Sequence, residues 1–361
     1  QLTSDIYDLK DVDVFIVTVP TPVDRYNIPD TGPLTQACKD VGAVLKESSG
    51  VIFESTVWPG MTEEICIPIL EERSGLTVNE QFLVGYSPER VNPGDRINTV
   101  GKIAKLVAGS NAEATELFAK LYECVIEAPV IRVSNIATAE MSKVIENAQR
   151  DINIAFVNEV ALCCDHLGLD TFDVLDAACT KWNFLDFRPG LVGGHCIGVD
   201  PYYLKHRMES IGYYPQILAS GRRLNESMAE HVARKIFKLV RSKNRFNWEN
   251  ESALLVCGLA FKKNCPDTRN TKVKNLVIKL QECGFKVMTF DPLVAHSLVS
   301  TAEHFSSLEA VREVIVDVLV LAVDHDQIVD ELENLISFQA QRPCIFDLTG
   351  TLPKGSVDGR I

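Results

Sequence analysis

Several familiar sequence signals are missing from this chain of 361 residues. No apolar stretch approaches the roughly 20 residues that a membrane helix needs, and no basic start followed by an apolar run indicates a signal peptide. The longest apolar stretches, 12–19 and 314–323, are interrupted by Asp13 and Asp317. We therefore expect a cytoplasmic protein with no membrane partner.

The 11 cysteines form no CxxC pair and lie mostly within apolar strand or helix patterns. This usage is typical of reduced, buried thiols and argues against a disulfide framework or a zinc ribbon. His195 and Cys196 are neighbours without a second ligand pair, so we expect no metal site. A net charge of −13 argues against nucleic acid as a partner. Anionic ligands would have to be held by a few placed Lys and Arg side chains.

None of the 21 glycines stands in a GxG pair, although a dinucleotide-binding domain normally opens with a strand and a GxGxxG turn. The rest of the pattern is that of an α/β protein, because Val-rich and Ile-rich runs alternate with helical patterns. The first part has expected strands at 12–19, 51–55, 82–86 and 102–107, with helices near 33–47, near 61–73 and from 112. The last part has strands at 253–257, 286–290, 316–323 and 344–348, with helices at 273–283, near 308–314 and at 327–337. Such alternation predicts parallel sheets with crossover helices.

The middle of the chain is expected to be helical. One long helix should run from an N-cap at Ser134 to a C-cap at Gly168. Further helices are expected near 172–179, 201–211 and 223–240, before a polar break at 241–252. We therefore predict three domains: α/β at 1–133, helical at 134–240 and α/β at 241–361.

Two places carry candidate chemistry. The segment 189–204 is rich in glycine and holds Cys196, with Asp200 four residues later. A thiol in such a loop fits a catalytic nucleophile as well as it fits a tight turn with a buried thiol. On the long helix, Lys143 and Asn147 share one face and could stabilise an oxyanion, although the spacing fits a solvated helix face as well.

Six motifs in this order are recognisable. They are VPTPVD at 19–24, ESTV at 54–57, YSPERVNPG at 86–94, K-x3-N at 143–147, GGHCIGVD at 193–200 and GLAFKKNCPDTR at 258–269. Together they strongly resemble the UDP-glucose/GDP-mannose dehydrogenase family over almost the whole chain. The resemblance implies a Rossmann-like NAD-binding domain, a helical centre for dimerisation and catalysis, and a Rossmann-like UDP-sugar domain. It also implies a homodimer or a higher homo-oligomer.

The implied reaction is a four-electron oxidation of a sugar C6 alcohol to a carboxylate with two NAD+. The resemblance makes Cys196 the nucleophile that passes through a thiohemiacetal and a thioester. It makes Lys143 and Asn147 the groups that stabilise the oxyanion at C6, with Lys143 also assisting deprotonation. Asp200 matches the family carboxylate that holds a water near C6.

The implied hydrolysis of the thioester involves Glu89 and Thr56. Glu89 matches the acid that activates the water, and Thr56 matches the hydroxyl that positions it near the nicotinamide. The second glutamate of the UDP-glucose enzymes is replaced here by Pro93. The motif forms look like the branch that oxidises UDP-N-acetylglucosamine or UDP-N-acetylgalactosamine for surface polysaccharides. The alternatives are UDP-N-acetylmannosamine as substrate, or an inactive binding module.

The implied ligand contacts are distributed over all three domains. On the cofactor side they are Thr21, Pro22, Thr56 and Arg269; on the sugar-nucleotide side they are Lys143, Asn147, Gly193 and Lys262, with Arg188 and Arg223 as further phosphate candidates. In this family the Gly-rich turn precedes the strand at 12–19, which here follows only eleven residues. We therefore expect an incomplete NAD domain lacking roughly 60–90 residues, an exposed sheet edge, weak NAD binding and little turnover.

Overall fold

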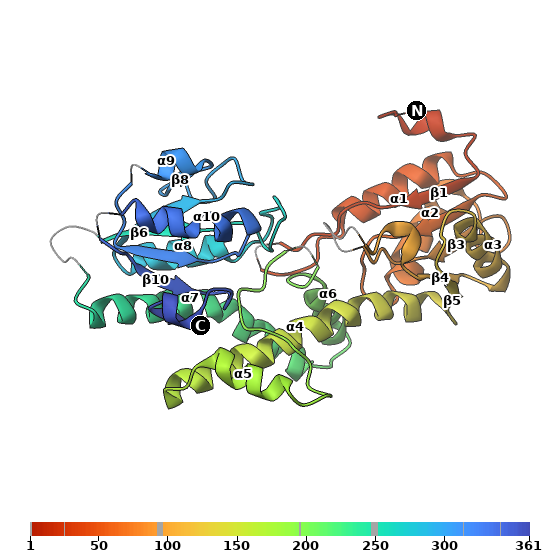
Figure 1. The fold of residues 1–361 in the computed structure, drawn as a ribbon. Coiled ribbons are helices and arrows are strands. Elements are labelled where there is room, and N and C mark those ends of the chain that lie inside the picture. The colour runs from red at the N-terminus through yellow and green to blue at the C-terminus, as the bar shows by residue number, and fades with distance from the viewer. Residues whose placement is uncertain are drawn as a thin grey trace. The chain divides into compact units, whose positions relative to one another are not determined.

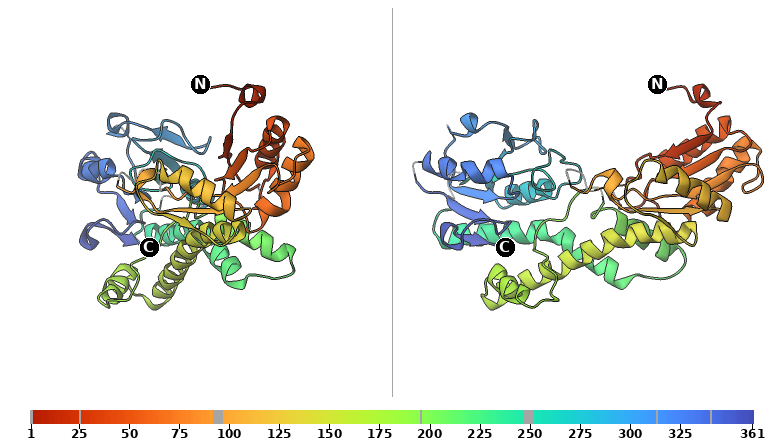
Figure 2. Two further views of the ribbon diagram at one scale, coloured as in Figure 1. Left: turned by 90° about the vertical axis from the view of Figure 1, so that its right-hand side faces the viewer. Right: turned by 45° about the vertical axis from the view of Figure 1, so that its right-hand side comes forward.

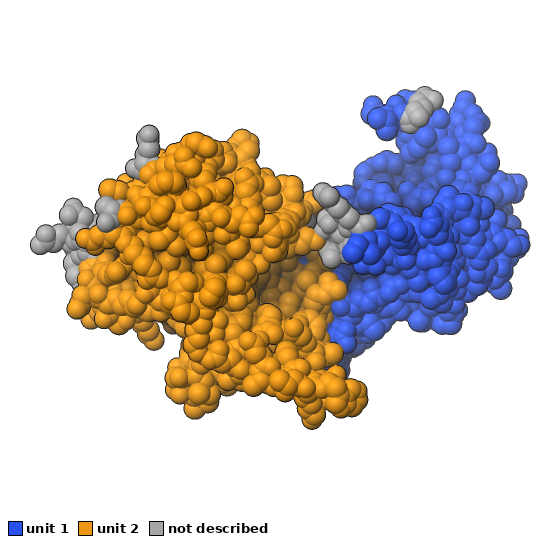
Figure 3. Space-filling model, viewed as in Figure 1, with its two compact units in different colours: residues 1–149, 199–216 blue, residues 150–198, 217–361 orange. Residues whose placement is uncertain are grey.

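The computed structural model describes residues 2–24, 26–91, 97–194, 196–246, 252–312, 314–339 and 341–361. The chain divides into two compact units, coloured separately in Figure 3. Unit 1 comprises residues 1–149 and 199–216, and unit 2 comprises residues 150–198 and 217–361. The predicted division into three domains is a finer one and stays a prediction.

Unit 1 contains a five-stranded sheet in the order β1-β2-β3-β4-β5 (Figure 1). Its strands are β1 (Val14–Val17), β2 (Gly50–Phe53), β3 (Leu83–Tyr86), β4 (Lys105–Gly109) and β5 (Val130–Arg132). The first three are parallel, as predicted, but β4 is antiparallel to β3. The prediction of a wholly parallel sheet was wrong here, because the described part of the β3–β4 connection has only a short 3-10 turn, η3 (Val100–Lys102), and no crossover helix.

Helices cover both faces of this sheet. On one face, α1 (Gly32–Val44) and α2 (Ile67–Ser74), preceded by the π-helical turn η2 (Thr62–Cys66), pack on alternate residues of β1, β2 and β3. On the other face, α3 (Ala112–Glu123) packs on β2 and β4. The strand β1 lies at the edge of the described sheet, with the Ile16 side chain half exposed. The 3-10 turn η1 (Ile6–Leu9) precedes it.

The long helix predicted in the middle of the chain is α4 (Ile136–Leu167), visible in both views of Figure 2. Its 32 residues correspond to about 48 Å. Asn135 is the N-cap rather than Ser134, because the Asn135 side chain accepts the Thr138 N–H at 2.8 Å. Gly168 ends the helix with a φ of +70°, as predicted. No helix of the described residues combines the length and apolar character required to cross a membrane.

Unit 2 contains a parallel six-stranded sheet in the order β11-β10-β9-β6-β7-β8. Its strands are β6 (Ser252–Cys257), β7 (Phe285–Phe290), β8 (Glu303–Phe305), β9 (Val318–Leu321), β10 (Cys344–Asp347) and β11 (Gly359–Arg360). Counted from β6, this is the 3-2-1-4-5-6 order of a doubly wound nucleotide-binding fold. Strands β5, β8 and β11 are too short to have been found from their residue pattern.

Five helices and one 3-10 turn complete the described part of unit 2, and one further helix, α6, completes unit 1. They are α5 (Thr171–Cys179), α6 (Asp200–Ser210, unit 1), α7 (Gln216–Ser242), α8 (Val273–Glu282), α9 (Leu308–Arg312), α10 (Asp326–Ser337) and η4 (Lys354–Ser356). Helices α7 and α8 pack on one face of the sheet, and α9 and α10 on the other. This layered arrangement is the Rossmann-like architecture expected for the last domain.

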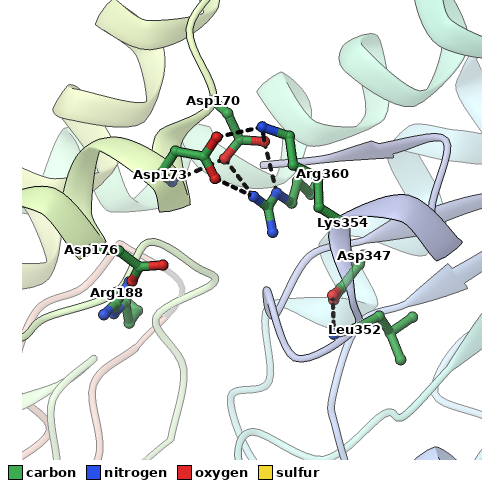
Figure 4. A network of polar contacts seen from close by, with 8 residues as sticks. All are labelled: Asp170, Asp173, Asp176, Arg188, Asp347, Leu352, Lys354 and Arg360. Atoms are coloured by element: carbon green, nitrogen blue, oxygen red, sulfur yellow. Dashed lines mark hydrogen bonds and ion pairs between the residues drawn. The ribbon is translucent and has the colours of Figure 1, made fainter.

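An ion-pair network joins the start of α5 to the last residues of the chain (Figure 4). Arg360 donates two hydrogen bonds of 2.8 Å to Asp170 and one of 3.0 Å to Asp173, and Lys354 also pairs with Asp173. Burial opposes ionisation of Asp170, but the Arg360 hydrogen bonds and the nearby cations lower the pKa of that carboxyl to about 2. The network therefore holds α5 against β11.

Substituting Arg360→Ala is expected to reduce the free energy of unfolding by about 2 kcal/mol at pH 7, because the largely buried Asp170 carboxylate loses both of its Arg360 hydrogen bonds and the exposed Asp173 loses one. Asp170 has a lowered pKa, so its contribution is present above about pH 4 and disappears as the pH falls toward 2. Urea unfolding at pH 7 and pH 3 measures both effects. The control is Arg234→Ala, because the Arg234 side chain is 69% exposed and pairs with Glu230; this substitution should cost less than about 0.5 kcal/mol. Equal losses from both variants would contradict the prediction.

Candidate active site

In unit 1 the loops after β1 and β2 are tied together at the carboxyl edge of the sheet. The Ser55 hydroxyl donates to the Val19 carbonyl at 2.7 Å, and the Tyr203 hydroxyl of α6 donates to the Pro22 carbonyl at 3.3 Å. These bonds fix the segments that carry the predicted cofactor residues Thr21, Pro22 and Thr56. Thr21 and Thr56 are half-buried and Pro22 is exposed, so the loops still present groups to a ligand.

The structure brings three of the predicted residues together within unit 1. Lys143 and Asn147 lie one turn apart on α4, and both face Asp200, the first residue of α6. The Asn147 amide donates to Asp200 Oδ2 at 2.6 Å, and Lys143 Nζ lies 3.8 Å from the same oxygen. All three residues are less than 10% exposed. The spacing alone also allowed Lys143 and Asn147 to lie on a solvated helix face, and that interpretation is therefore wrong.

Burial raises the pKa of Asp200 from 3.8 to about 6, against the opposing effects of Lys143 and Asn147. The carboxyl is therefore largely ionised at neutral pH but takes up a proton under mildly acidic conditions. A carboxylate with this pKa can accept or hold a proton during a reaction near neutral pH.

A second buried carboxyl, Glu140, was not found from the sequence. It lies on α4 one turn before Lys143 and accepts the N–H groups of Gly60 at 2.6 Å and of Thr62 at 3.0 Å. Burial raises the pKa of Glu140 to about 7, although these hydrogen bonds oppose the shift. Glu140 thus anchors the segment that follows Thr56. Its spacing from Lys143 gave no signal, because an E-x-x-K pattern is common on exposed helices.

We expect kcat to fall as the pH drops below about 6, by about tenfold per unit, because protonation removes the Asp200 carboxylate. The raised pKa of Asp200 sets the sign of this expectation, because the ionised carboxylate is lost on the acidic side of about 6, well above the ordinary range of an aspartate. Initial rates between pH 5 and pH 8 measure this limb.

Glu140→Gln is the control for that profile, since Glu140 is a buried carboxyl one turn before Lys143 and its pKa is also raised. The variant should retain the acid limb near pH 6. Disappearance of the limb in Glu140→Gln would show that Asp200 is not the titrating group.

In unit 2, the loop that carries Cys196 packs against the loop that follows β6. A Cβ on Gly193 would lie 2.7 Å from the Asn270 carbonyl, and one on Gly194 would lie 2.9 Å from the Phe261 ring. Gly194 also has a φ of +86°. Only glycine permits this approach, and Cys196, two residues further on, is partly exposed. The tight turn predicted as an alternative is present, but it does not bury the thiol.

Arg269 lies within electrostatic reach of this thiol. Its guanidinium forms a bidentate pair with Asp267, which is the largest cause of its raised pKa, and the charge of the Cys196 thiolate raises that pKa further. The positive charge of Arg269 is therefore close enough to Cys196 to interact with it electrostatically.

The Cys196 loop is also held by the buried side-chain amide of Asn158, which was not predicted from the sequence. Asn158 of α4 donates to the Gly190 carbonyl at 3.1 Å and accepts the Gly190 N–H at 2.9 Å. Asn158 in turn bonds Asn225 of α7, which donates to Asp151 at 2.7 Å. Arg222 pairs with Asp151 as well. The segment leading to Cys196 is thereby fixed to two helices.

The loop bearing Lys262 follows β6 at the point where the strand order of the sheet reverses, which is where open α/β sheets bind ligands. Asp291 accepts the Leu259 N–H at 2.6 Å and pairs with His325 at 3.2 Å. His325 Nδ1 accepts the Asn264 N–H at 2.7 Å. These fully buried partners fix both ends of the segment around Lys262, which is itself partly exposed.

Of the two further phosphate candidates, Arg188 is engaged within the protein. Its guanidinium bonds Asp186 and Asp176 at 2.6 Å each, as the close-up in Figure 4 shows for Asp176. Arg223 is exposed on α7 and reaches Ser220 at 3.4 Å. A phosphate at Arg188 would have to displace two carboxylates, so of these two further candidates the geometry favours Arg223.

His195 and Pro93, which entered the interpretation of the sequence, lie outside the described residues. All eleven cysteines are free thiols, and six of them are buried. This agrees with the prediction of reduced cysteines rather than a disulfide framework.

Models of three domains match the chain in sequence order. The NAD binding domain of the UDP-glucose/GDP-mannose dehydrogenase family matches residues 1–126, its central domain 137–227 and its UDP binding domain 255–354. These matches define an NAD-dependent oxidoreductase that acts on nucleotide sugars. The chain belongs to the UDP-glucose/GDP-mannose dehydrogenase family, and its class is that of the UDP-sugar 6-dehydrogenases.

Individual relatives agree with this assignment. The chain is 44% identical to a UDP-N-acetyl-D-glucosamine 6-dehydrogenase of Salmonella typhi and 46% identical to one of Pseudomonas aeruginosa, in each case over 100% of this chain and 85% of the relative. A solved structure of a UDP-N-acetyl-D-mannosamine dehydrogenase from Pyrococcus horikoshii is similar with a TM-score of 0.87 and 31% identity, over 99% of this chain and 82% of that one. The resemblance seen in the motifs and the predicted fold class are thereby confirmed.

Proposed function

We propose that this protein oxidises C6 of a UDP-N-acetylhexosamine, UDP-N-acetylglucosamine or UDP-N-acetylgalactosamine, to the uronic acid for surface polysaccharide synthesis. The observation that carries the proposal is the partly exposed Cys196. Its loop packs through glycines closely against the segment that bears Lys262 and Arg269. A nucleophilic thiol distinguishes a four-electron dehydrogenase from one that stops at the aldehyde, because the thiol retains the aldehyde as a thiohemiacetal.

The proposed steps balance as follows. The C6 alcohol loses a hydride and a proton to give the aldehyde. The Cys196 sulfur adds to the aldehyde carbon, and the thiohemiacetal loses a second hydride and proton to give a thioester. Water adds, the C–S bond breaks, and a carboxylate and the thiol result. The overall reaction consumes one water and two NAD+ and releases two NADH and three protons.

Lys143, Asn147 and Asp200 fit the charge changes at C6. The ammonium and the amide would stabilise negative charge on the C6 oxygen, and Asp200, with a pKa of about 6, would accept a proton or hold a water there. Glu89 is exposed after β3, and its carboxylate accepts the Val91 N–H. It would activate the hydrolytic water, with the Thr56 hydroxyl positioning that water.

The loops of unit 1 fit NAD at the carboxyl ends of β1 and β2. The bonds Ser55–Val19 and Tyr203–Pro22 set the two loops in fixed positions, and Thr21 and Thr56 keep their side chains partly exposed there. Bound NAD+ supplies the hydride acceptor in both oxidations. Arg269 would neutralise a pyrophosphate charge, and Lys262 would contact the UDP-sugar.

The substrate choice rests on the two relatives named UDP-N-acetyl-D-glucosamine 6-dehydrogenase. A second candidate substrate is UDP-N-acetylmannosamine, supported by the similar solved structure of the dehydrogenase for that sugar. The test is NADH formation by the full-length protein with each UDP-sugar in parallel, with uronate identified by mass spectrometry. Preference for the manno epimer would select the second candidate, and no turnover with any sugar would support an inactive binding module.

We also propose a cytoplasmic homodimer or higher homo-oligomer. Met141 and Ile145, one turn apart on α4, are 36% and 46% exposed, and Phe156 further along the helix is 56% exposed. An apolar stripe of this kind is typical of a helix that packs against a second copy. The free thiols support a reducing compartment. Sedimentation equilibrium measures the assembly.

A further inference from the structure

Lys105, the first residue of β4, meets groups from three other elements of unit 1. Because β4 is antiparallel to β3, it begins at the edge where β2 and β3 end. The Lys105 ammonium lies 3.1 Å from Glu54 Oε1, just after β2, and donates to the Pro88 carbonyl, just after β3, at 3.3 Å. It also lies 5.0 Å from the centroid of the Tyr122 ring on α3.

The polar groups of Lys105, Glu54 and Tyr122 are paired with one another in a largely buried position. Lys105 is 8% exposed and Tyr122 is 6% exposed. The Tyr122 hydroxyl donates to the same oxygen of Glu54 that pairs with Lys105. Burial, together with the charge of Glu54, raises the pKa of Tyr122, so the phenol remains a donor. The Ser87 hydroxyl donates to the Leu106 carbonyl at 2.7 Å and ties β4 to the same loop a second time.

We propose that Lys105 is a positioning residue for thioester hydrolysis, because it fixes the spacing between the two loops that carry Thr56 and Glu89. Thr56 follows Glu54 by two residues, and Glu89 directly follows Pro88. One ammonium therefore contacts both loops within two residues of the groups assigned to the hydrolytic water. This inference rests on the proposed function. It adds a residue that positions the groups assigned to the last step, the hydrolysis of the thioester.

The step itself needs only water. The water oxygen adds to the thioester carbon, and the C–S bond breaks with its electron pair going to the Cys196 sulfur. Of the two protons of the water, one leaves through Glu89 and one returns to the sulfur, and the products are a carboxylate and the Cys196 thiol. Nothing is oxidised, so loosening the two loops should slow this step without slowing the hydride transfers. A buried ion pair often adds little net stability, whereas its geometry is specific.

The test uses Lys105→Met in the full-length protein with UDP-N-acetylglucosamine and NAD+. We expect a burst of two NADH per active site at the wild-type rate, followed by a steady-state kcat lowered at least tenfold. Acid quenching and mass spectrometry of the Cys196 peptide should then show the accumulated acyl adduct. Binding of UDP, measured by calorimetry, should change less than twofold, since Lys105 belongs to unit 1 and the UDP binding domain spans 255–354.

Lys102→Met is the matched control, because it removes the same charge three residues away at an exposed position. Lys105→Arg should restore much of kcat, since a guanidinium can reach both Glu54 and the Pro88 carbonyl. Tyr122→Phe keeps the ring and loses the hydroxyl that bonds Glu54 and interacts with Ser87, so it should slow hydrolysis about threefold. It serves as the second variant if Lys105→Met does not fold.

The inference is overturned if the variants of Lys105 and Tyr122 show kcat within twofold of Lys102→Met, or if burst and steady state fall in proportion with no acyl adduct. Either result would leave Lys105 with a purely structural role. Failure of the proposed function has a different signature, because the wild-type protein itself would then form no NADH and no Cys196 adduct.

Discussion

Cys196→Ser in the full-length protein is expected to lower uronate formation at least about 10³-fold while leaving UDP-sugar binding unchanged. Serine has nearly the same shape, but its hydroxyl is a far weaker nucleophile at neutral pH than a thiol that gains thiolate character. Uronate is quantified by mass spectrometry and binding by calorimetry.

Cys163→Ser is the control for this substitution. Cys163 is an exposed thiol on α4, so its loss should leave the rate within about twofold of the wild type. If Cys196→Ser produced uronate at the rate of this control, Cys196 would not be the nucleophile. The proposal of a four-electron reaction would then lose its main support.

The second large effect is expected from Gly194→Ala. A φ of +86° is unfavourable for alanine by about 1–2 kcal/mol, and the new Cβ would meet the Phe261 ring at 2.9 Å. The loop must shift, and displacing a reacting group by about 1 Å can cost about 100-fold in rate. We therefore expect kcat/KM to fall about 100-fold, while the folded protein still melts cooperatively.

Gly190→Ala is its matched control, four residues earlier in the same segment. There the nearest atom to a new Cβ is Leu348 Cδ2 at 4.0 Å, and φ is not positive. The two hydrogen bonds with Asn158 involve only the backbone of residue 190, so they remain intact in this variant. Gly190→Ala should therefore keep at least a third of the activity. Similar activities for the two variants would show that the tight packing of Gly194 does not position Cys196.

Much of the fold could be predicted because it depends on local pattern. The long helix α4 was predicted from its apolar spacing and from Gly168, within two residues at either end. The cap was assigned to Ser134 rather than Asn135 because both residue types cap helices well, and only the structure shows which side chain reaches Thr138.

What could not be predicted depends on contacts between distant residues. Lys105 is functionally informative only because β4 reverses direction, and nothing in the strand itself signals that reversal. Arg188 was a reasonable phosphate ligand by residue type, but its neighbour Asp176 comes from α5. Asn158 and Gly190 lie 32 residues apart and contact each other through their polar atoms. Such a contact produces no periodic pattern in the sequence from which it could be predicted.

The ring of His325 has a consequence for chemical modification. Its Nδ1 lone pair accepts the Asn264 N–H, its Nε2 proton faces Asp291, and the side chain is fully buried. An electrophile such as diethyl pyrocarbonate attacks an accessible ring nitrogen that has an available lone pair, and His325 offers none. If such a reagent inactivates the enzyme, the modified group is therefore one of the other six histidines or another nucleophile, and the loop that carries Lys262 should remain intact.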